Sequence, residues 1–292
     1  MSQYFCSIVD NALRNPAQRM YFDLGDYRYG LTVVGDGEPI VCFHGFSESS
    51  YTWDSINLPD YRLIRIDLIG HGDSDIPEEG EAYTIPQMIE DLHTVIYHMV
   101  GDRYYLMGYS MGARIALSYA LEYESEIKGL ILESGSVGIA SDAERLERRK
   151  ADEDLAVHIE NHDGAWFATR WAKAPIFESQ KQLSEGVEEL IYLRRSNNST
   201  YALACTLRGS GQGVMTYVGD QLEKLSCKGL YVSGALDTKY TTIGRDVFGK
   251  LPNFKHVIVE GAGHNVHIEK PQMFEQAVLD FLHKKGQVHE QI

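Results

Sequence analysis

The chain has few cysteines, a shortage of basic residues and no long apolar run. Its four cysteines are far apart and form no C-x-x-C pair: Cys6, Cys42, Cys205 and Cys227. This usage favours reduced thiols in a cytoplasmic protein over a disulfide framework. No apolar run approaches the roughly 20 residues that a membrane helix needs, so no membrane insertion is expected. Residues 1–15 lack a basic start followed by an apolar core, so no secretory signal is expected either.

Basic residues number 27 against 42 acidic ones, for a formal net charge of −15. Such a charge disfavours nucleic acid and anionic membrane surfaces as partners. It is compatible with an anionic small molecule, because a local cluster of arginines reverses the field inside one cleft. Neither a metal-ligand cluster nor a phosphate-binding glycine loop is visible, so no metal and no cofactor are expected. The sequence carries no signal for oligomeric state.

Apolar runs and helical patterns alternate along most of the chain, which predicts a mostly parallel, doubly wound α/β sheet. The predicted strands are Met20–Leu24, Tyr27–Val34, Ile40–Phe43, Leu63–Leu68, Tyr104–Gly108, Leu130–Glu133, Gly229–Ser233 and His256–Glu260. The first two, joined by Gly25-Asp26, should form an antiparallel hairpin at the sheet edge. The predicted helices are Ile85–Val100, Met111–Tyr123 and Gln272–Lys285.

Strand-like runs vanish between about residues 140 and 213, where charged helical stretches surround an aromatic one. This segment is interpreted as a helical cap inserted over the edge of the sheet where such folds bind ligands. The predicted organisation is an N-terminal extension over 1–17, a core formed by 18–139 and 214–292, and a cap over 140–213.

Gly108-Tyr109-Ser110-Met111-Gly112 reads G-x-S-x-G between a predicted strand and a predicted helix. In this context the pattern is typical of a nucleophile elbow, a sharp turn that exposes the serine at the top of a sheet. A serine hydroxyl needs an imidazole within hydrogen-bond reach, and the imidazole needs a carboxylate that fixes its tautomer.

Candidate partners for Ser110 follow later strands in the order Ser, Asp, His that this architecture uses. Asp237 comes just after the strand Gly229–Ser233, and His264 follows the strand His256–Glu260 through a Gly-rich loop. These three residues are predicted to form a catalytic triad. His267 is the rival base, ranked second because it lies inside the following segment.

The loop His44-Gly45-Phe46 after the third strand should supply a backbone N–H to an oxyanion, with Phe46 as the candidate donor. The second donor is the N–H of Met111. His44 and His71 are interpreted as structural residues that tie neighbouring loops together.

Arg114 lies four residues after Ser110 and so on the same helix face, directed toward the predicted site. A buried guanidinium is costly unless it is paired or meets an anionic ligand, so an internal ion pair is the alternative. The cap adds further arginines at 145, 148, 149, 194 and 195. Taken alone, the run Arg145–Arg149 is most simply a solvated helix face.

From about Pro39 to Pro271 the chain resembles the 2-succinyl-6-hydroxy-2,4-cyclohexadiene-1-carboxylate synthases of the α/β-hydrolase superfamily. General motifs carry part of the resemblance, namely the G-x-S-x-G sequence and the Gly-His pair at 263–264. The specific part comprises Arg114 after the elbow, Trp171 with Phe177, and Arg195-Ser196-Asn197-Asn198. Ala113 stands where glycine is common in the family.

The resemblance implies an α/β-hydrolase fold and a lyase of menaquinone biosynthesis that eliminates pyruvate from an enolpyruvyl-cyclohexene tricarboxylate. It implies proton abstraction by Ser110, backed by His264 and Asp237, without a cofactor. By the same likeness Arg114, Arg148 and Arg195 would bind substrate carboxylates, and Tyr109 and Trp171 would line the ring pocket.

Two other interpretations remain open at this point. The same triad would serve a C–C bond hydrolase or a carboxylesterase, although such enzymes typically carry an apolar residue at position 114. A non-enzymatic protein that kept the fold would show a broken triad, and the three candidate residues are intact.

Overall fold

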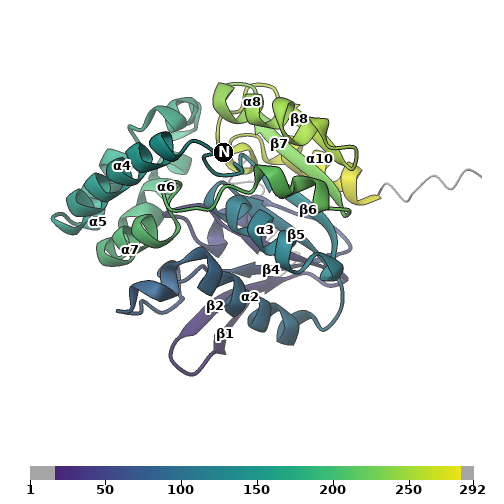
Figure 1. Cartoon of the computed structure of the whole chain (residues 1–292), viewed down its shortest axis with the longest axis horizontal. Coiled ribbons are helices and arrows are strands. Elements are labelled where there is room, and N and C mark those ends of the chain that lie inside the picture. The colour runs from purple at the N-terminus through teal and green to yellow at the C-terminus, as the bar shows by residue number, and fades with distance from the viewer. Residues whose placement is uncertain (1–16, 284–292) are drawn as a thin grey trace, which may run out of the picture.

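The computed structural model describes residues 17–283, and its centre is an eight-stranded sheet in the order β1-β2-β4-β3-β5-β6-β7-β8 (Figure 1). The strands are β1 Gln18–Asp23, β2 Arg28–Val34, β3 Glu38–Phe43, β4 Tyr61–Ile66, β5 Tyr104–Tyr109, β6 Ile127–Glu133, β7 Lys228–Gly234 and β8 Phe254–Val259. All eight predicted strands are confirmed, and their ends agree with the prediction to within three residues.

Strand β2 pairs with both β1 and β4 in the antiparallel sense, and every other pairing is parallel. The predicted edge hairpin is therefore confirmed. Because strands β3 to β8 run in one direction, the loops that leave β3, β5, β7 and β8 emerge at the same edge of the sheet. Ligands bind at this carboxyl edge in open α/β sheets.

Alternating side chains of each inner strand enter two separate cores, one on each face of the sheet. On β3, for example, Val41 and Phe43 belong to one core whereas Ile40 and Cys42 belong to the other. Burial on both faces explains why the inner strands read as nearly continuous apolar runs.

Helices cover both faces and close the two cores. Helices α2 (Ile85–Val100), α3 (Met111–Glu122) and α8 (Thr238–Asp246) cover the first core, and α10 (Pro271–His283) covers the second. Helix α2 begins at Thr84, whose side chain caps it, and ends at Gly101 in a left-handed conformation. The last helix also has Pro271 at its start, as expected; the predicted residues 284 and 285 lie outside the described part.

Four helices follow β6 and gather beside the sheet in Figure 1: α4 Asp142–Glu160, α5 Gly164–Trp171, α6 Glu185–Ser196 and α7 Thr200–Ser210. We call residues 142–210 the helical segment. Its helices have a small core of their own around Phe167 and Leu203. The side chain of Ala202 on α7 joins the core of the main sheet, which anchors the segment.

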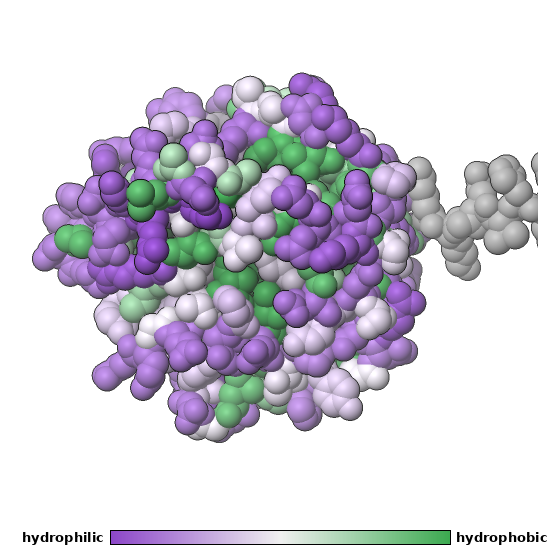
Figure 2. All heavy atoms as spheres, viewed as in Figure 1, coloured by the Kyte–Doolittle hydropathy of each residue, from purple (hydrophilic) through white to green (hydrophobic). Residues whose placement is uncertain are grey.

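Hydrophilic side chains dominate the face of the molecule in Figure 2, and apolar ones show mainly in recesses between helices. Within residues 17–283 no helix combines the length and apolar character that crossing a bilayer requires. The short helix α9 (Val266–Glu269) lies just before α10. Almost all of the predicted N-terminal extension, residues 1–16, falls outside the described residues.

Close packing between β5 and α3 predicts that Gly108→Ala destabilises the protein. A Cβ at this position would lie 2.4 Å from the carbonyl oxygen of Gly112, which is backbone and cannot move aside alone. We expect a loss of about 1–3 kcal/mol, typical of overpacking, measured by urea unfolding. Gly80→Ala is the control, since nothing lies within 4 Å of its added Cβ; equal stability of the two variants would contradict this packing argument.

Candidate active site

Ser110 stands at the turn between β5 and α3 in a backbone conformation with φ of +52°, which is rare for a residue with a side chain. Its neighbours two positions away must be small for the turn to form. A Cβ on Gly112 would lie 2.4 Å from the carbonyl oxygen of Phe43, and one on Gly108 would meet Gly112. The backbone N–H of Ser110 donates to the carbonyl of Glu133 at 2.8 Å, which fixes the turn on β6.

The three predicted triad residues meet at the carboxyl edge of the sheet. His264 Nε2 lies 2.9 Å from Ser110 Oγ, and His264 Nδ1 lies 2.7 Å from Asp237 Oδ2. With Nδ1–H donating to the carboxylate, Nε2 is free to accept the serine proton. The other oxygen of Asp237 accepts the backbone N–H of Tyr240 and caps α8, so the carboxylate is held from both sides.

His267 is not the base in this arrangement. Its Nε2 lies 2.7 Å from Thr52 Oγ1 and its Nδ1 2.7 Å from Glu133 Oε2, and its ring stacks on Trp53. His267 and Glu133 are both fully buried. The ring therefore belongs to a network below the site and has no free nitrogen for Ser110.

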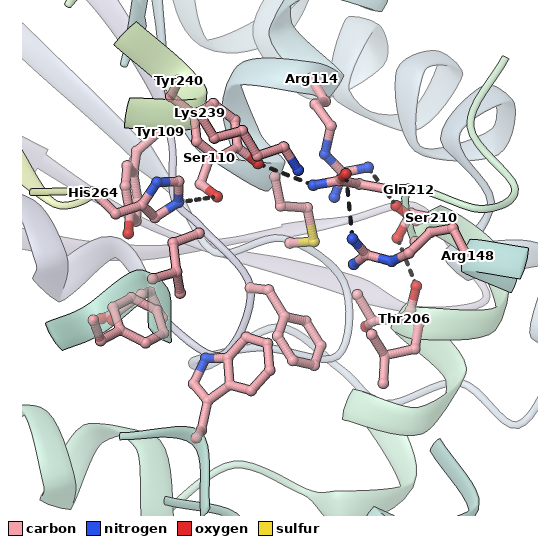
Figure 3. A pocket seen from close by; sticks show the side chains of 18 residues that line it. Tyr109, Ser110, Arg114, Arg148, Thr206, Ser210, Gln212, Lys239, Tyr240 and His264 are labelled. Atoms are coloured by element: carbon pink, nitrogen blue, oxygen red, sulfur yellow. Dashed lines mark hydrogen bonds between the residues drawn. The ribbon is translucent and has the colours of Figure 1, made fainter. Parts of the chain in front are cut away.

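A cavity of about 220 Å³ opens above Ser110 and His264, between the sheet edge and the helical segment (Figure 3). Aromatic and aliphatic side chains supply its apolar wall, and charged groups gather opposite His264. The lining residues are Phe46, Glu48, Tyr109, Ser110, Met111, Arg114, Arg148, Trp171, Ile176, Phe177, Thr206, Leu207, Ser210, Gly211, Gln212, Lys239, Tyr240 and His264.

Arg114 reaches the cavity from α3, one turn beyond Ser110, and is only 6% exposed. Its Nη1 donates to the carbonyl oxygen of Ser210 at 2.9 Å, and within residues 17–283 it forms no ion pair within 4.0 Å. The alternative of an internal ion pair is therefore not realised among these residues. Burial lowers the pKa of Arg114 to about 10, because desolvation disfavours the charged form.

Arg148 and Lys239 join Arg114 at the same wall (Figure 3). Arg148 Nε donates to Asp152 Oδ1 at 2.7 Å, which holds the side chain across one helical turn of α4. Burial lowers the pKa of Lys239, and the nearby charge of Arg148 lowers it further. Arg145 instead pairs with exposed Asp142, so the run Arg145–Arg149 has a solvated side and one residue that faces the cavity.

Arg195 differs from the expectation of direct substrate contact, because it does not line this cavity. It is 1% exposed and lies over the Phe177 ring, with its Cζ 4.2 Å from the ring centroid. Its Nη2 lies 3.5 Å from Glu48 Oε1. Arg195 thus lines a neighbouring cavity, with the ring of Phe177 between the two.

Phe46 and Met111 both line the cavity where the oxyanion donors were predicted. Met111 begins α3, and the first N–H groups of a helix have no partner inside it. The loop that carries Phe46 is fixed by His44, whose Nε2 accepts the backbone N–H of Leu68 at 2.9 Å. His71 packs against the rings of His44 and Phe46. Both histidines therefore tie loops together, as the sequence indicated.

Several residues that line the cavity were not among the site residues predicted from the sequence. Lys239 lies two positions after Asp237, where the first turn of α8 aims it inward; this spacing was the available signal. Gln212 links Arg148 to Tyr240 through hydrogen bonds of 3.3 and 3.0 Å. Glu48 follows the Phe46 loop and had no recognisable pattern around it.

Comparisons with known proteins agree with this geometry. The sequence profile of the α/β hydrolase fold matches residues 38–271. A Bacillus subtilis protein, provisionally named a 2-succinyl-6-hydroxy-2,4-cyclohexadiene-1-carboxylate synthase, is 36% identical over 87% of this chain and 94% of its own length. A synthase of the same name from Citrobacter koseri is 30% identical over 80% of this chain and 90% of its own.

This chain belongs to the 2-succinyl-6-hydroxy-2,4-cyclohexadiene-1-carboxylate synthase family. The resemblance seen in the sequence is thereby confirmed, and so is the α/β-hydrolase fold. A solved structure described as MenH from S. aureus superimposes with a TM-score of 0.80 at 29% identity, over 89% of this chain and 98% of that one. An esterase from Thermogutta terrifontis reaches 0.78 at 24% identity over 91% of this chain and 98% of that one, which shows the shared fold alone.

Buried His44 predicts that this member of the synthase family loses stability in mild acid. Its Nε2 must be unprotonated to accept the N–H of Leu68, and burial lowers its folded pKa to about 4. The unfolded ring, with a pKa of about 6.5, binds a proton first, so stability falls as pH drops from 6.5 toward 4. We expect about 2 kcal/mol lost to this residue between pH 7 and 5.

Denaturant unfolding at pH 7, 6 and 5 measures this effect. His44→Asn should be less stable than the wild type at pH 7 yet lose less on acidification. His98→Asn changes an exposed histidine on α2 and should keep the wild-type pH dependence. An unchanged slope in His44→Asn would contradict the assignment.

Proposed function

We propose that this enzyme eliminates pyruvate from 2-succinyl-5-enolpyruvyl-6-hydroxy-3-cyclohexene-1-carboxylate to give 2-succinyl-6-hydroxy-2,4-cyclohexadiene-1-carboxylate, in menaquinone biosynthesis. Its relatives bear the name of this product's synthase. The observation that carries the proposal is Arg114: a buried cation without an ion-pair partner among the described residues, one helical turn from the serine.

Ser110 and His264 would act as the base. The serine accepts a proton from the ring carbon that bears the succinyl carbonyl, while its own proton passes to His264 Nε2. Asp237, 2.7 Å from Nδ1, stabilises the imidazolium that forms. The 2.9 Å separation of Ser110 Oγ and His264 Nε2 supports this relay.

Negative charge developing on the succinyl carbonyl oxygen would be stabilised by the backbone N–H groups of Phe46 and Met111. The electron pair then moves through the ring and breaks the C–O bond to the enolpyruvyl group. The departing enolate takes up a proton and becomes pyruvate. No water is consumed, so the reaction is an elimination on a hydrolase scaffold.

Arg114, Arg148 and Lys239 would hold the substrate carboxylates, since each is a donor that lines the cavity. We assign Arg195 no direct contact with the substrate, because it lines a neighbouring cavity and stacks on the ring of Phe177, which lines both. Tyr109 and Trp171 would line the ring pocket. The indole Nε1 of Trp171 is buried and has no hydrogen-bond partner within residues 17–283, so it is available as a further donor.

A serine hydrolase with the same triad is the alternative. Its cavity would bind an ester or a neutral ketone, and three cations at one wall would then be desolvated without an anionic ligand. The assembled Ser110, His264 and Asp237 also oppose a non-enzymatic role. We further propose that the helical segment acts as a cap over the site and that the enzyme works in the cytoplasm.

Ser110→Ala should lose most pyruvate release. The enolpyruvyl substrate is supplied, pyruvate is followed by a coupled assay, and a reaction without enzyme corrects for spontaneous breakdown. Loss of the base should lower kcat by about a hundredfold or more. Full activity in the variant would overturn the catalytic role. Fast turnover of p-nitrophenyl acetate with an acyl-enzyme burst, and no pyruvate from the substrate, would favour the hydrolase alternative.

Arg114→Ala should lower kcat/KM by more than tenfold, because one charge-assisted contact is worth roughly 1.5–3 kcal/mol. Arg148→Ala should act in the same direction. Arg149→Ala is the matched control: it removes an exposed arginine from the neighbouring position of α4 and should leave kcat/KM near the wild-type value. Equal effects of the changes at 148 and 149 would indicate a general charge effect and contradict a specific site.

A further inference from the structure

Glu48 is the single carboxylate among the described residues that line the catalytic cavity. It is 3% exposed and sits two positions after Phe46. The loop that carries it is fixed: Ser47 adopts a φ of +63°, and Glu48 N donates to Gly45 O. Asn198, between α6 and α7 of the helical segment, donates from Nδ2 to the carbonyl of Ser47 at 2.9 Å. Backbone and cap residues thus place this carboxylate at the cavity wall.

Hydrogen bonding of this carboxylate is incomplete. Glu48 Oε1 lies 3.5 Å from Arg195 Nη2, and Oε2 has no partner within residues 17–283. Arg195 also has unpaired donors, since its Nε and Nη1 have no hydrogen-bond partner within the same residues. A buried acceptor without a donor costs free energy, so Glu48 has unused capacity that a donor on a ligand would satisfy.

A carboxylate is an unexpected lining group for a cavity that receives an anion. Its presence points to a part of the ligand that donates a hydrogen bond. If the proposed function holds, on which this inference rests, the ligand offers one hydroxyl donor: the ring 6-hydroxyl named in the product of the relatives. The side chains of Arg114, Arg148 and Lys239 are hydrogen-bond donors only, so they cannot accept a hydrogen bond from this hydroxyl.

Several other acceptors at the wall already have hydrogen-bond partners, whereas Glu48 Oε2 has none within residues 17–283. Gln212 Oε1 accepts from Arg148, and Tyr240 Oη accepts from Gln212. The hydroxyl of Ser110 faces His264. We propose that Glu48 accepts the hydrogen bond of the 6-hydroxyl and makes the enzyme selective for hydroxylated ligands, while Arg195, 3.5 Å from Oε1, orients the carboxylate from behind.

Selectivity is tested by binding, without turnover, with one ligand that carries the hydroxyl and one that lacks it. The first is the product; the second is 2-succinylbenzoate, which keeps both carboxylates but has lost the hydroxyl and has an aromatic ring, so the variants rather than the wild type alone isolate the contribution of Glu48. Titration calorimetry should show the wild type preferring the product by roughly tenfold to a hundredfold, the value of a hydrogen bond to a charged group. In Glu48→Ala this ratio should fall toward one, chiefly through weaker product binding.

Two further variants separate recognition from folding. Glu48→Gln keeps the volume and a neutral acceptor, so its ratio should lie between those of the wild type and Glu48→Ala. Glu48→Ala leaves Arg195 buried without a carboxylate, which can destabilise the fold. The double variant Glu48→Ala with Arg195→Met removes both charges and avoids this cost. Its affinity ratio should be as low as that of Glu48→Ala. Glu188→Ala removes an exposed carboxylate on the helix of Arg195 and should keep the wild-type ratio.

An unchanged ratio in Glu48→Ala, or in the double variant if the single one does not fold, overturns the inference. So does a wild type that fails to prefer the product or binds neither ligand. The proposed function is judged separately by pyruvate release from the wild type. Normal pyruvate release with no change in ratio would therefore remove the role of Glu48 and leave the function standing.

Discussion

The close approach of β5 and α3 at Ser110 is the constraint on which the rest of the site depends. Two glycines allow it, because a side chain at either Gly108 or Gly112 would collide with backbone atoms only 2.4 Å away. The turn lifts the serine out of the sheet and starts α3 directly beneath the cavity. It thereby fixes three things at once: the serine hydroxyl, the free N–H of Met111, and the direction in which Arg114 points four residues later.

Electrostatic imbalance distinguishes this cavity from a neutral hydrolase pocket. Arg114 is buried against a carbonyl group rather than a carboxylate. Burial lowers the pKa of Lys239, and the charges of Arg148 and Arg114 lower it further. Arg148 has a partner in Asp152. Desolvating cations without counter-charges is unfavourable in the empty enzyme, and an anionic ligand would remove that cost on binding. The protein as a whole is strongly acidic, so this local excess of positive charge is a property of the site.

Most of the fold could be predicted from the sequence, since it follows from local patterns. Apolar runs predicted all eight strands, and apolar periodicity predicted the bounds of α2. The elbow was recognisable because its glycines are required by sterics at a fixed spacing. The order of Ser110, Asp237 and His264 after successive strands placed them at one edge, because parallel strands end on the same side. The choice of His264 over His267 rested on position alone, and the structure adds the reason: His267 is engaged by Thr52 and Glu133.

The sequence by itself determined the elbow and the direction of Arg114, because helix periodicity controls local direction. It also placed the oxyanion loop, Asp237 and His264 at one edge, because parallel strands end on the same side. Tertiary structure alone decided which side chains of the helical segment and of the loops reach the cavity. Arg148 and Arg195 look alike as arginines of charged helices, yet Arg148 lines the cavity and Arg195 lies behind Phe177. Glu48 is placed at the wall by the backbone turn of its own loop and by the contact of Asn198 with that loop. Such outcomes depend on how helices pack across the sheet edge, and no short-range pattern encodes that geometry.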